Sequence, residues 1–381
     1  MAIVVTACET AAPAAPGPVA SPAASPASTS QSASPVATPS PAPPRPAVAF
    51  LQDLSPEGAL EPLLPVYRAV ELALAAVSLD PEEPLEVELV AFDTAGDPDV
   101  AAEIAAQIAE DPRFVAAMAS PELPGQSHLM ARLSRDGVPV LSLSGRGSPQ
   151  GAPDGAWLRF VAPVRTLAGV LAGTAGALRR ADDGICLVRA PSDGTVLGRV
   201  ARTTLLPTHE VTEVDGADEV HGCGVVLWAG GALDGAELAA ALSSRPHPPV
   251  LVGGPALRDP RFLTLAGDAQ AVAVCSCVDL STSLELEAQR FIQDFQTEYG
   301  RPPGPYVVEA WDAARLLLAA MRDGGPTRSA VWGRIAGLGA LDGLGGPYRF
   351  EDGELADPAS FVRVYRVRGG RWLEVAAPRN A

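Results

Sequence analysis

Short apolar runs alternate with amphipathic stretches along the chain from residue 47 onward. Several runs are apolar at nearly every position, which is typical of parallel strands that are covered on both faces. The alternation is repeated twice and therefore predicts an α/β fold with two parallel sheets. The predicted strands are Ala47–Gln52, Leu85–Phe92, Val115–Ala119, Val138–Leu143, Ile185–Ala190, Glu210–Val214, Val225–Ala229, Val250–Val252 and Ala271–Val278.

Three helices are predicted most clearly. Val100–Glu110 is preceded by Asp97 and Pro98, which suit the N-cap and the first helical position. Apolar residues recur at helical spacing over Leu284–Tyr299 and over Val307–Met321, and we interpret their aromatic members as core. The chain then turns to short strands with Gly-rich turns, at Pro347–Phe350, Phe361–Val367 and Trp372–Val375.

The N-terminus is an apolar run that ends in small residues and Cys8. Val5-Thr6-Ala7-Cys8 resembles the processing site of bacterial lipoproteins, which implies that Cys8 carries a lipid. The run is shorter than the roughly 7 to 15 residues of a signal core and lacks a basic start. We therefore infer that the natural start lies upstream; an ordinary cysteine is the alternative. Residues 1–8 thus form a truncated signal segment.

Residues 9–46 are rich in Pro, Ala and Ser, and no charged residue occurs from Thr10 to Pro44. Such a stretch cannot bury enough apolar surface to offset its ordering entropy. Its prolines favour an extended coil. We expect a disordered spacer that holds a folded part away from a membrane.

Every one of the 28 basic residues is Arg, against 45 acidic residues. The absence of Lys excludes Walker-type phosphate loops, pyridoxal Schiff bases and lysine nucleophiles, because each needs that ammonium group. The acidic balance and the scattered Arg residues argue against nucleic acid as a partner. A GC-rich genome explains the missing Lys best.

Four further cysteines, Cys186, Cys223, Cys275 and Cys277, occur in the predicted folded region. The sequence alone does not decide their pairing. Cys275 and Cys277 are two apart on a predicted strand, so both face one side and a direct bond would be strained. Since Cys is among the most buried residue types, we expect buried free thiols.

Five segments carry a resemblance to a known family. They are Glu88–Val100, Gly137–Ser142, Val252–Pro255, Asp259–Asp268 and Phe295–Trp311. In this order and spacing, the chain resembles the leucine/isoleucine/valine-binding proteins, type I periplasmic binding proteins that serve ABC transporters. The resemblance covers nearly everything outside the leader and the spacer.

The resemblance implies two Rossmann-like lobes with a ligand held at the carboxyl ends of both sheets, as is general for open α/β sheets. It also implies a hinge of three connections, which we place near Pro163, Val278 and Gly325. Lobe I then comprises residues 47–162 and 279–325, and lobe II comprises residues 163–278 and 326–381.

The ligand candidates of lobe I lie at predicted strand ends. In amino-acid binders of the family, Ser and Thr hydroxyls hold the ligand carboxylate. Here Ser120 follows the third strand, Ser144 and Arg146 follow the fourth, and Ser55 is a further candidate. Arg146 lies near the place of a family hydroxyl, and Arg binds oxyanions more strongly than a hydroxyl does. We expect a small polar or anionic ligand; a solvated Arg in a Gly-rich turn is the alternative.

Two family determinants of amino-acid binding are altered in lobe II. Asp193 stands where a tyrosine is usual, and Ala256 stands where an acidic residue would meet an amino group. A standard α-amino acid is therefore not the expected ligand, unless Asp193 takes over the ammonium contact. Trp228, at the end of a strand, either stacks on the ligand or belongs to the core.

These features predict a non-catalytic, extracytoplasmic solute-binding lipoprotein that closes its lobes around a small molecule. We expect a monomer that serves an ABC permease, touches the membrane only through its lipid, and needs no cofactor or metal. The alternatives are a sensor or surface interaction protein of the same fold, or a protein with a degenerate cleft that makes only protein contacts.

Three patterns that resemble catalytic or metal motifs compete weakly with this interpretation. Ser192 mimics a hydrolase nucleophile elbow, but no His lies near the C-terminus, where that fold supplies its base. Gly145–Gly151 resembles a dinucleotide-binding loop, but Pro149 prevents the helix whose N-terminus such a site needs. His221–Cys223 and Cys275–Cys277 lack the ligand count of a metal site.

Overall fold

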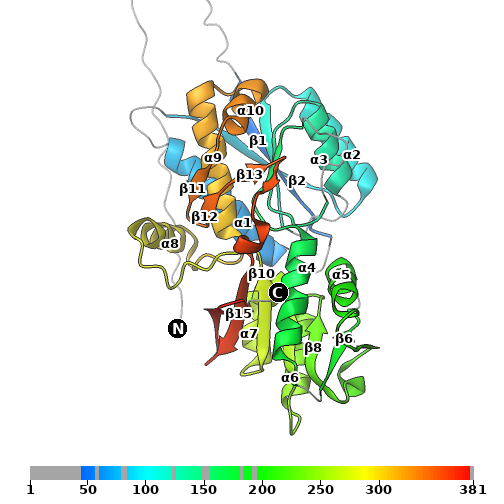
Figure 1. Cartoon of the computed structure of the whole chain (residues 1–381). Coiled ribbons are helices and arrows are strands. Elements are labelled where there is room, and N and C mark those ends of the chain that lie inside the picture. Colours follow the sequence, from blue (N-terminus) through cyan, green and yellow to red (C-terminus); the bar gives the residue numbers. More distant parts are fainter. Residues whose placement is uncertain are drawn as a thin grey trace, which may run out of the picture. The chain divides into compact units, whose positions relative to one another are not determined.

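Lobe I is built around a five-stranded sheet of order β2-β1-β3-β4-β5 (Figure 1). All neighbouring strands pair in parallel, as the apolar runs predict. The strands are β1 (Ala47–Gln52), β2 (Glu88–Asp93), β3 (Phe114–Ala119), β4 (Val140–Ser142) and β5 (Trp157–Arg159). The computed structural model describes residues 44–55, 60–78, 84–121, 126–147, 155–180, 183–190 and 195–377.

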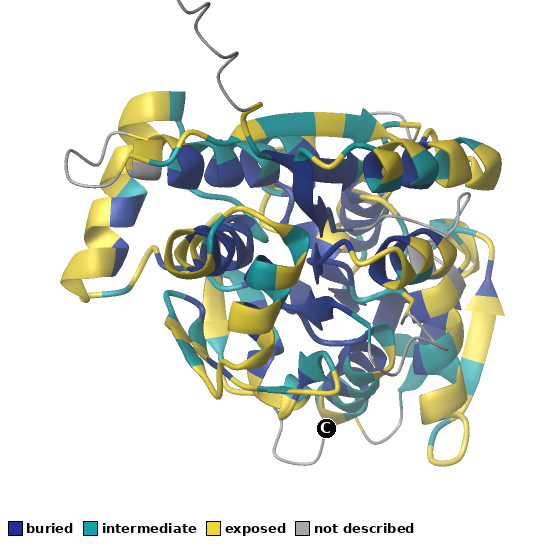
Figure 2. Cartoon of the chain, turned by 90° about the horizontal axis from the view of Figure 1, so that it is seen from above, coloured by how far each residue is buried: buried dark blue, intermediate teal, exposed yellow. Residues whose placement is uncertain are grey.

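Helices cover both faces of this sheet, because side chains along a buried strand alternate between the faces. Val48 and Phe50 of β1 point to one face, and Ala49 and Leu51 point to the other. The first face packs against α1 (Leu60–Ser78), α8 (Leu286–Tyr299), α9 (Val307–Gly324) and α10 (Arg328–Ala336). The second packs against α2 (Pro98–Glu110) and α3 (Gln126–Arg135). Figure 2 shows the buried residues gathered on strands and inner helix faces.

Lobe II contains a seven-stranded sheet of order β16-β15-β10-β9-β8-β6-β7. Strands β6 to β10 pair in parallel, and β15 and β16 add an antiparallel edge. The strands are β6 (Gly184–Val188), β7 (Val211–Val214), β8 (Cys223–Trp228), β9 (Val250–Gly253), β10 (Ala271–Cys275), β15 (Arg363–Arg368) and β16 (Arg371–Val375). One face packs against α4 (Val164–Leu178) and α5 (Thr195–Leu205), and the other against α6 (Ala232–Ser243) and α7 (Pro260–Ala266).

Three connections join the lobes. The first runs from β5 through residues 160–163 into α4, and the second runs from β10 through residues 276–285 into α8. The third is Val362, which lies between the short helix η3 (Pro358–Phe361) and β15. The fold class predicted from the sequence is therefore confirmed, because the two parallel sheets and three crossings are present.

The predicted position of the third connection near Gly325 is wrong. Helix α10 and the hairpins that follow it pack with the core of lobe I. The hairpin strands are β11 (Leu341–Gly343), β12 (Gly346–Tyr348), β13 (Phe350–Glu351) and β14 (Glu354–Leu355). Arg328 explains the placement, because its guanidinium donates to four main-chain carbonyls of lobe I, those of Ile108, Ala109, Asp111 and Phe114.

Most predicted elements are present with shifted ends. Asp97 caps α2 as expected, and its side chain accepts a hydrogen bond from the Asp99 amide. Strand β5 was not predicted, because three residues are too short a run to recognise. The helix predicted to begin at Leu284 begins only at Leu286, and Leu284 is 96% exposed.

Both cysteine pairs form disulfides, Cys186–Cys223 and Cys275–Cys277, so the expectation of free thiols is wrong. The predicted strand to Val278 was too long, since β10 ends at Cys275. The Cα atoms of Cys275 and Cys277 are 5.2 Å apart, whereas residues two apart in an extended strand are separated by about 6.6 Å. The chain therefore bends where it leaves the sheet, and the bend permits the bond.

Residues 44–381 form one unit, distinct from residues 1–43. The leader with Cys8 and most of the spacer lie outside the described residues. No helix within the described ranges is long and apolar enough to span a membrane.

Candidate functional site

The two lobes repeat one topology. In lobe I the strand order reverses between β1 and β3, and in lobe II it reverses between β6 and β8. Open parallel sheets bind ligands outside their carboxyl ends at such switch points. The candidate site therefore consists of the residues that follow these strands and their neighbours.

Ser120 and Ser144 follow β3 and β4, and both are fully buried. The Ser120 amide donates to Leu51 of β1 at 2.9 Å, and its hydroxyl donates to the Pro121 carbonyl at 3.3 Å. The Ser144 hydroxyl accepts from the Arg146 amide at 3.1 Å. Both hydroxyls thus lie at the predicted strand ends, where they order the loops around the switch point.

Arg146 is half-buried in the turn after β4. The preceding Gly145 lies against the first connection, since a Cβ there would lie 2.8 Å from the Ala162 carbonyl. The Gly145 carbonyl accepts from the Val164 amide, the first residue of α4, at 2.8 Å. Arg146 is therefore on a lobe I loop that touches the start of lobe II.

Asp53, which the sequence reasoning missed, lies directly after β1 and is 4% exposed. Its Oδ1 accepts from the amide and hydroxyl of Ser55, at 2.9 and 2.6 Å. Its Oδ2 has no hydrogen-bond partner among the described residues. Gly96 faces both groups, because a Cβ there would lie 2.9 Å from the Ser55 Oγ and 3.3 Å from Oδ2. The sequence signal that could have identified Asp53 as a site residue is its position immediately after strand β1.

Arg159 was also missed, and it is a buried cation at the end of β5. Its guanidinium donates to the Gly147 carbonyl and lies 3.4 Å from Glu354 of β14. Burial disfavours the charged form of both groups. It lowers the pKa of Arg159, a shift that Glu354 opposes, and it raises the pKa of Glu354. Arg159 thereby ties the loop that carries Arg146 to the segment that leads into the third connection.

The lobe II candidates lie differently. Trp228 is 3% exposed, and its indole N–H donates to the Gly231 carbonyl at 2.9 Å, so the structure places this side chain in the core. Ala256 is exposed on the short helix η2 (Pro255–Arg258) after β9. Asp193 and Ser192 lie outside the described residues. Ser55, Ser120, Ser144 and Arg146 by contrast follow the parallel neighbours β1, β3 and β4, and so lie at one edge of the lobe I sheet.

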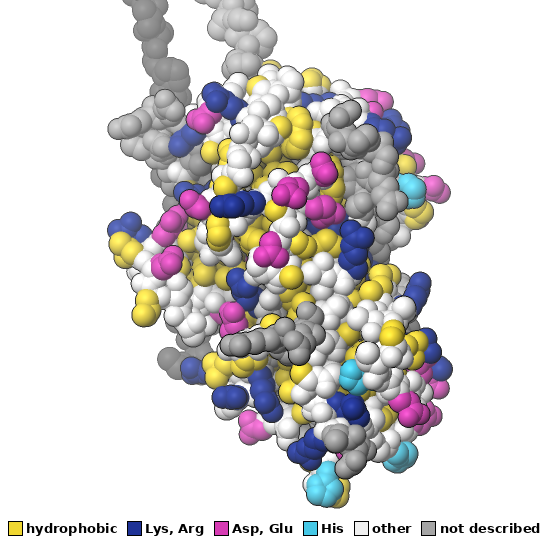
Figure 3. Space-filling model, viewed as in Figure 1, with side chains coloured by type: hydrophobic (Ala, Val, Ile, Leu, Met, Phe, Trp, Pro, Cys, Tyr) yellow, Lys and Arg dark blue, Asp and Glu magenta, His cyan; other side chains and the backbone are white. Residues whose placement is uncertain are grey.

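Charged side chains of both signs are interspersed on the face shown in Figure 3. No group of three or more His, Cys, Asp or Glu could hold a metal ion in the part of the chain that the structure describes. The arrangement at the lobe I edge can donate and accept hydrogen bonds and can bind an oxyanion through Arg146.

A family model described as periplasmic binding protein matches residues 192–371. An ABC transporter substrate-binding protein of Desulfitobacterium hafniense, in complex with Leu, is similar with 16% identity and a TM-score of 0.69, over 87% of this chain and 100% of that one. A branched-chain amino acid transporter substrate-binding protein of Streptococcus pneumoniae, in complex with isoleucine, shows 12% identity and a TM-score of 0.69 over the same shares.

A solute-binding protein of R. palustris, in complex with benzoate, is similar with 16% identity and a TM-score of 0.66, over 87% of this chain and 96% of that one. These likenesses bear on the fold. No curated protein matches the sequence.

Proposed function

We propose that the chain is a periplasmic binding protein that captures a small polar or anionic ligand between its lobes by hinge closure, since a family model of that description matches residues 192–371 and the fold is similar to that of substrate-binding proteins. The observation that carries this proposal is the repeated topology, which sets two switch points on lobes joined by three connections. Closure follows when the ligand contacts both lobes, since only differential affinity for the closed state shifts the equilibrium.

A carboxylate is the ligand group that the comparisons favour. The relatives described above hold Leu, isoleucine and benzoate, which share a carboxylate. In this chain Arg146 follows the buried Ser144 by two residues, in the turn after β4, and β4 pairs with β3, which Ser120 follows. We propose that Arg146 binds the anionic group and that Ser55 and Asp53 face the polar remainder, with Asp193 as the weaker candidate of lobe II.

Native mass spectrometry of the purified protein, with any co-purified ligand retained, identifies the ligand. Titration calorimetry with that ligand then compares wild type with Arg146→Ala. We expect about tenfold weaker binding or more, since a charged hydrogen-bonding partner is lost. Arg290→Ala on α8 is the matched control, because Arg290 is exposed and outside the candidate site. Unchanged affinity of Arg146→Ala would refute this assignment.

We further propose that the protein acts outside the cytoplasm for an ABC permease, as a monomer tethered by a lipid on Cys8. The two disulfides support an oxidising compartment. Metabolic labelling with an alkyne fatty acid tests the tether in cells that express the protein. Label on wild type that Cys8→Ser abolishes is expected, and equal labelling of both would refute the tether.

A further inference from the structure

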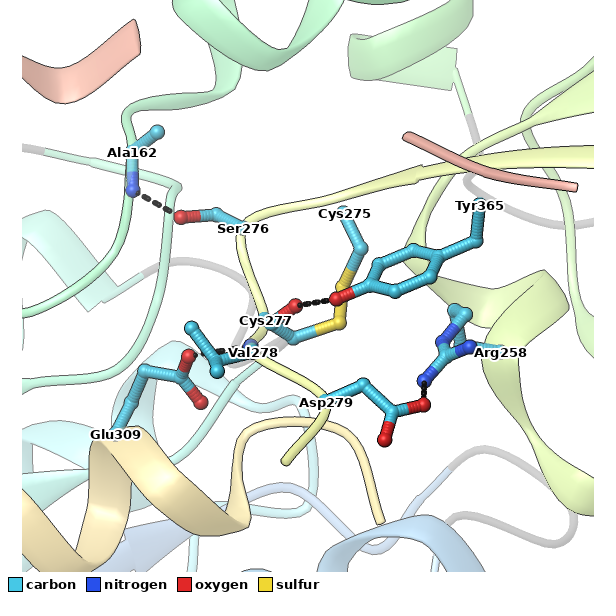
Figure 4. Close-up of a disulfide and its surroundings, with 9 residues drawn as sticks. All are labelled: Ala162, Arg258, Cys275, Ser276, Cys277, Val278, Asp279, Glu309 and Tyr365. Carbon is cyan, nitrogen blue, oxygen red and sulfur yellow. Dashed lines mark hydrogen bonds and ion pairs between the residues drawn. A yellow bond between two sulfur atoms is a disulfide. The ribbon is translucent and has the colours of Figure 1, made fainter. Parts of the chain in front are cut away.

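The segment Cys275–Asp279, here named the hinge segment, carries the chain out of lobe II into the second connection. Its first residue ends β10, and its cysteines are joined by a disulfide (Figure 4). Both cysteines are fully buried. The disulfide therefore lies at the point where the chain leaves the sheet of lobe II.

The hinge segment also contacts the first connection and the strand that follows the third. The Ser276 hydroxyl accepts a hydrogen bond from the Ala162 amide of the first connection at 2.7 Å. The Cys277 carbonyl accepts from the hydroxyl of Tyr365 at 2.7 Å, and Tyr365 lies on β15 just after the third connection. The tripeptide Cys275–Cys277 thus binds the first connection directly and binds the third through Tyr365, three residues after Val362.

Each lobe is attached to the next two residues of the hinge segment. The Val278 amide donates to Glu309 of α9, in lobe I, at 2.8 Å. Asp279 pairs with Arg258 of η2, in lobe II, at 2.8 Å. Figure 4 shows these partners arranged around the disulfide. A change in the path of the hinge segment therefore displaces contacts to both lobes.

The disulfide fixes that path. It holds the Cα atoms of Cys275 and Cys277 at 5.2 Å, against about 6.6 Å in an extended chain. Without the bond, the backbone at Ser276 can extend. Such an extension would shift the Ser276 hydroxyl and the Cys277 carbonyl, which are the atoms that bind the first connection and Tyr365.

We propose that the Cys275–Cys277 disulfide is a redox-sensitive site that sets the freedom of the hinge, an inference that rests on the proposed hinge closure. A dithiol reductant breaks the protein S–S bond and forms its own cyclic disulfide. Two electrons and two protons pass from the dithiol to the protein, which gains two thiols. The reduced hinge segment releases its bend, and the three connections become more mobile.

Burial decides when this exchange occurs. Neither sulfur is accessible in the described arrangement, so a dithiol reaches the bond only when the hinge segment opens locally. Whatever restrains the hinge therefore protects the disulfide, and the disulfide in turn restrains the hinge, because coupling between two sites is reciprocal.

Hydrogen exchange on the ligand-free full chain tests the proposal. The reporters are peptides that contain the Ala162 and Val278 amides, whose acceptors are on or beside the hinge segment. Cys275→Ser/Cys277→Ser is compared with wild type and with the matched control Cys186→Ser/Cys223→Ser, which removes the other disulfide within lobe II. We expect about tenfold faster exchange of both reporters in the hinge variant only.

Equal exchange in the hinge variant and wild type, or equal acceleration in the control, overturns the proposal. Wild type treated with dithiothreitol and alkylated, with thiols located by mass spectrometry, replaces the hinge variant if circular dichroism shows that the variant does not fold. Ser276→Ala keeps the disulfide and should accelerate hydrogen exchange of the Ala162 amide but not of the Val278 amide. Since no ligand is present, failure of the ligand search would leave this test unaffected.

Discussion

Replacing Glu309 by Gln isolates one buried acid at the hinge. Glu309 lies in the first turn of α9, is 2% exposed, and accepts from the Val278 amide through Oε1. Its Oε2 has no partner among the described residues. Burial is the main cause that raises its pKa to about 8, and Asp312 adds to the shift while Arg363 and the Val278 amide oppose it.

The sign follows from the direction of the shift. A pKa of about 8 in the folded protein, against an ordinary value near 4.3 in the unfolded chain, means that the folded state keeps a proton that the unfolded state loses. The contribution of Glu309 to the free energy of unfolding is therefore complete at low pH and falls as the pH rises through the pKa of the folded state. Between about pH 5 and about pH 8, the loss amounts to about 3 kcal/mol.

Urea unfolding of wild type and Glu309→Gln at several pH values, followed by circular dichroism, measures this loss. Gln keeps the oxygen that binds Val278 and cannot ionise, so the variant should gain about 3 kcal/mol relative to wild type from about pH 5 to about pH 8. Any cost of its unpartnered amide group is constant with pH. Glu287→Gln is the matched control, because Glu287 is exposed on α8 and paired with Arg315. Parallel stability curves for wild type and Glu309→Gln would refute the reasoning.

Three further predictions concern other contacts. Removing the Cys186–Cys223 disulfide, which closes a loop of sequence separation 37, should lower the free energy of unfolding by about 4 kcal/mol. Removing Cys275–Cys277 should lower it by about 2 kcal/mol, because the loop is shorter. Equal losses in urea titrations would contradict this. Arg328→Ala should lower the free energy of unfolding by about 3 kcal/mol in the same assay, because four carbonyls lose their donor. The control Arg290→Ala should lower it little. Gly345→Ala should cost at least about 2 kcal/mol, since a Cβ there would overlap the Tyr348 hydroxyl, and a stability equal to wild type would contradict that packing.

The parallel sheets were predictable because their strands are apolar on both faces. Ala47–Gln52 shows this best, since the predicted bounds agree with β1 and its core residues are buried from both sides. The assignment of α10 was not predictable, because an amphipathic helix carries no mark of which sheet it covers. Arg328 decides it through carbonyls more than 200 residues away in sequence, and such contacts leave no local pattern.

The candidate site was predictable only in its location. Parallel strands end at one edge, so Ser120 and Ser144 could be placed there from sequence order alone. The local hydrogen bonds of their hydroxyls could not be predicted from the sequence, because these bonds depend on the conformation of each turn. Trp228 shows the same limit, since its ring fills space left by Gly230 and Gly235, where a Cβ would lie 2.4 and 2.6 Å from indole atoms.

The hinge is held differently at its two ends. On the lobe I side, Glu309 of α9 accepts from the Val278 amide, and Asp312, one turn further along α9, fixes this helix within lobe I by accepting from the Leu344 and Gly345 amides and the Tyr348 hydroxyl. Burial raises the pKa of Asp312 to about 6, and breaking such bonds leaves buried groups without partners, at about 1 to 3 kcal/mol each.

On the lobe II side, the Asp279 carboxylate of the Arg258–Asp279 ion pair is 25% exposed, and partly solvated pairs rearrange more easily. Rotation of the lobes should therefore bend the second connection between Val278 and β10, on the lobe II side. That stretch contains the Cys275–Cys277 disulfide, so the bond adds to the restraint that the hydrogen bonds of Ser276 and Cys277 place on it.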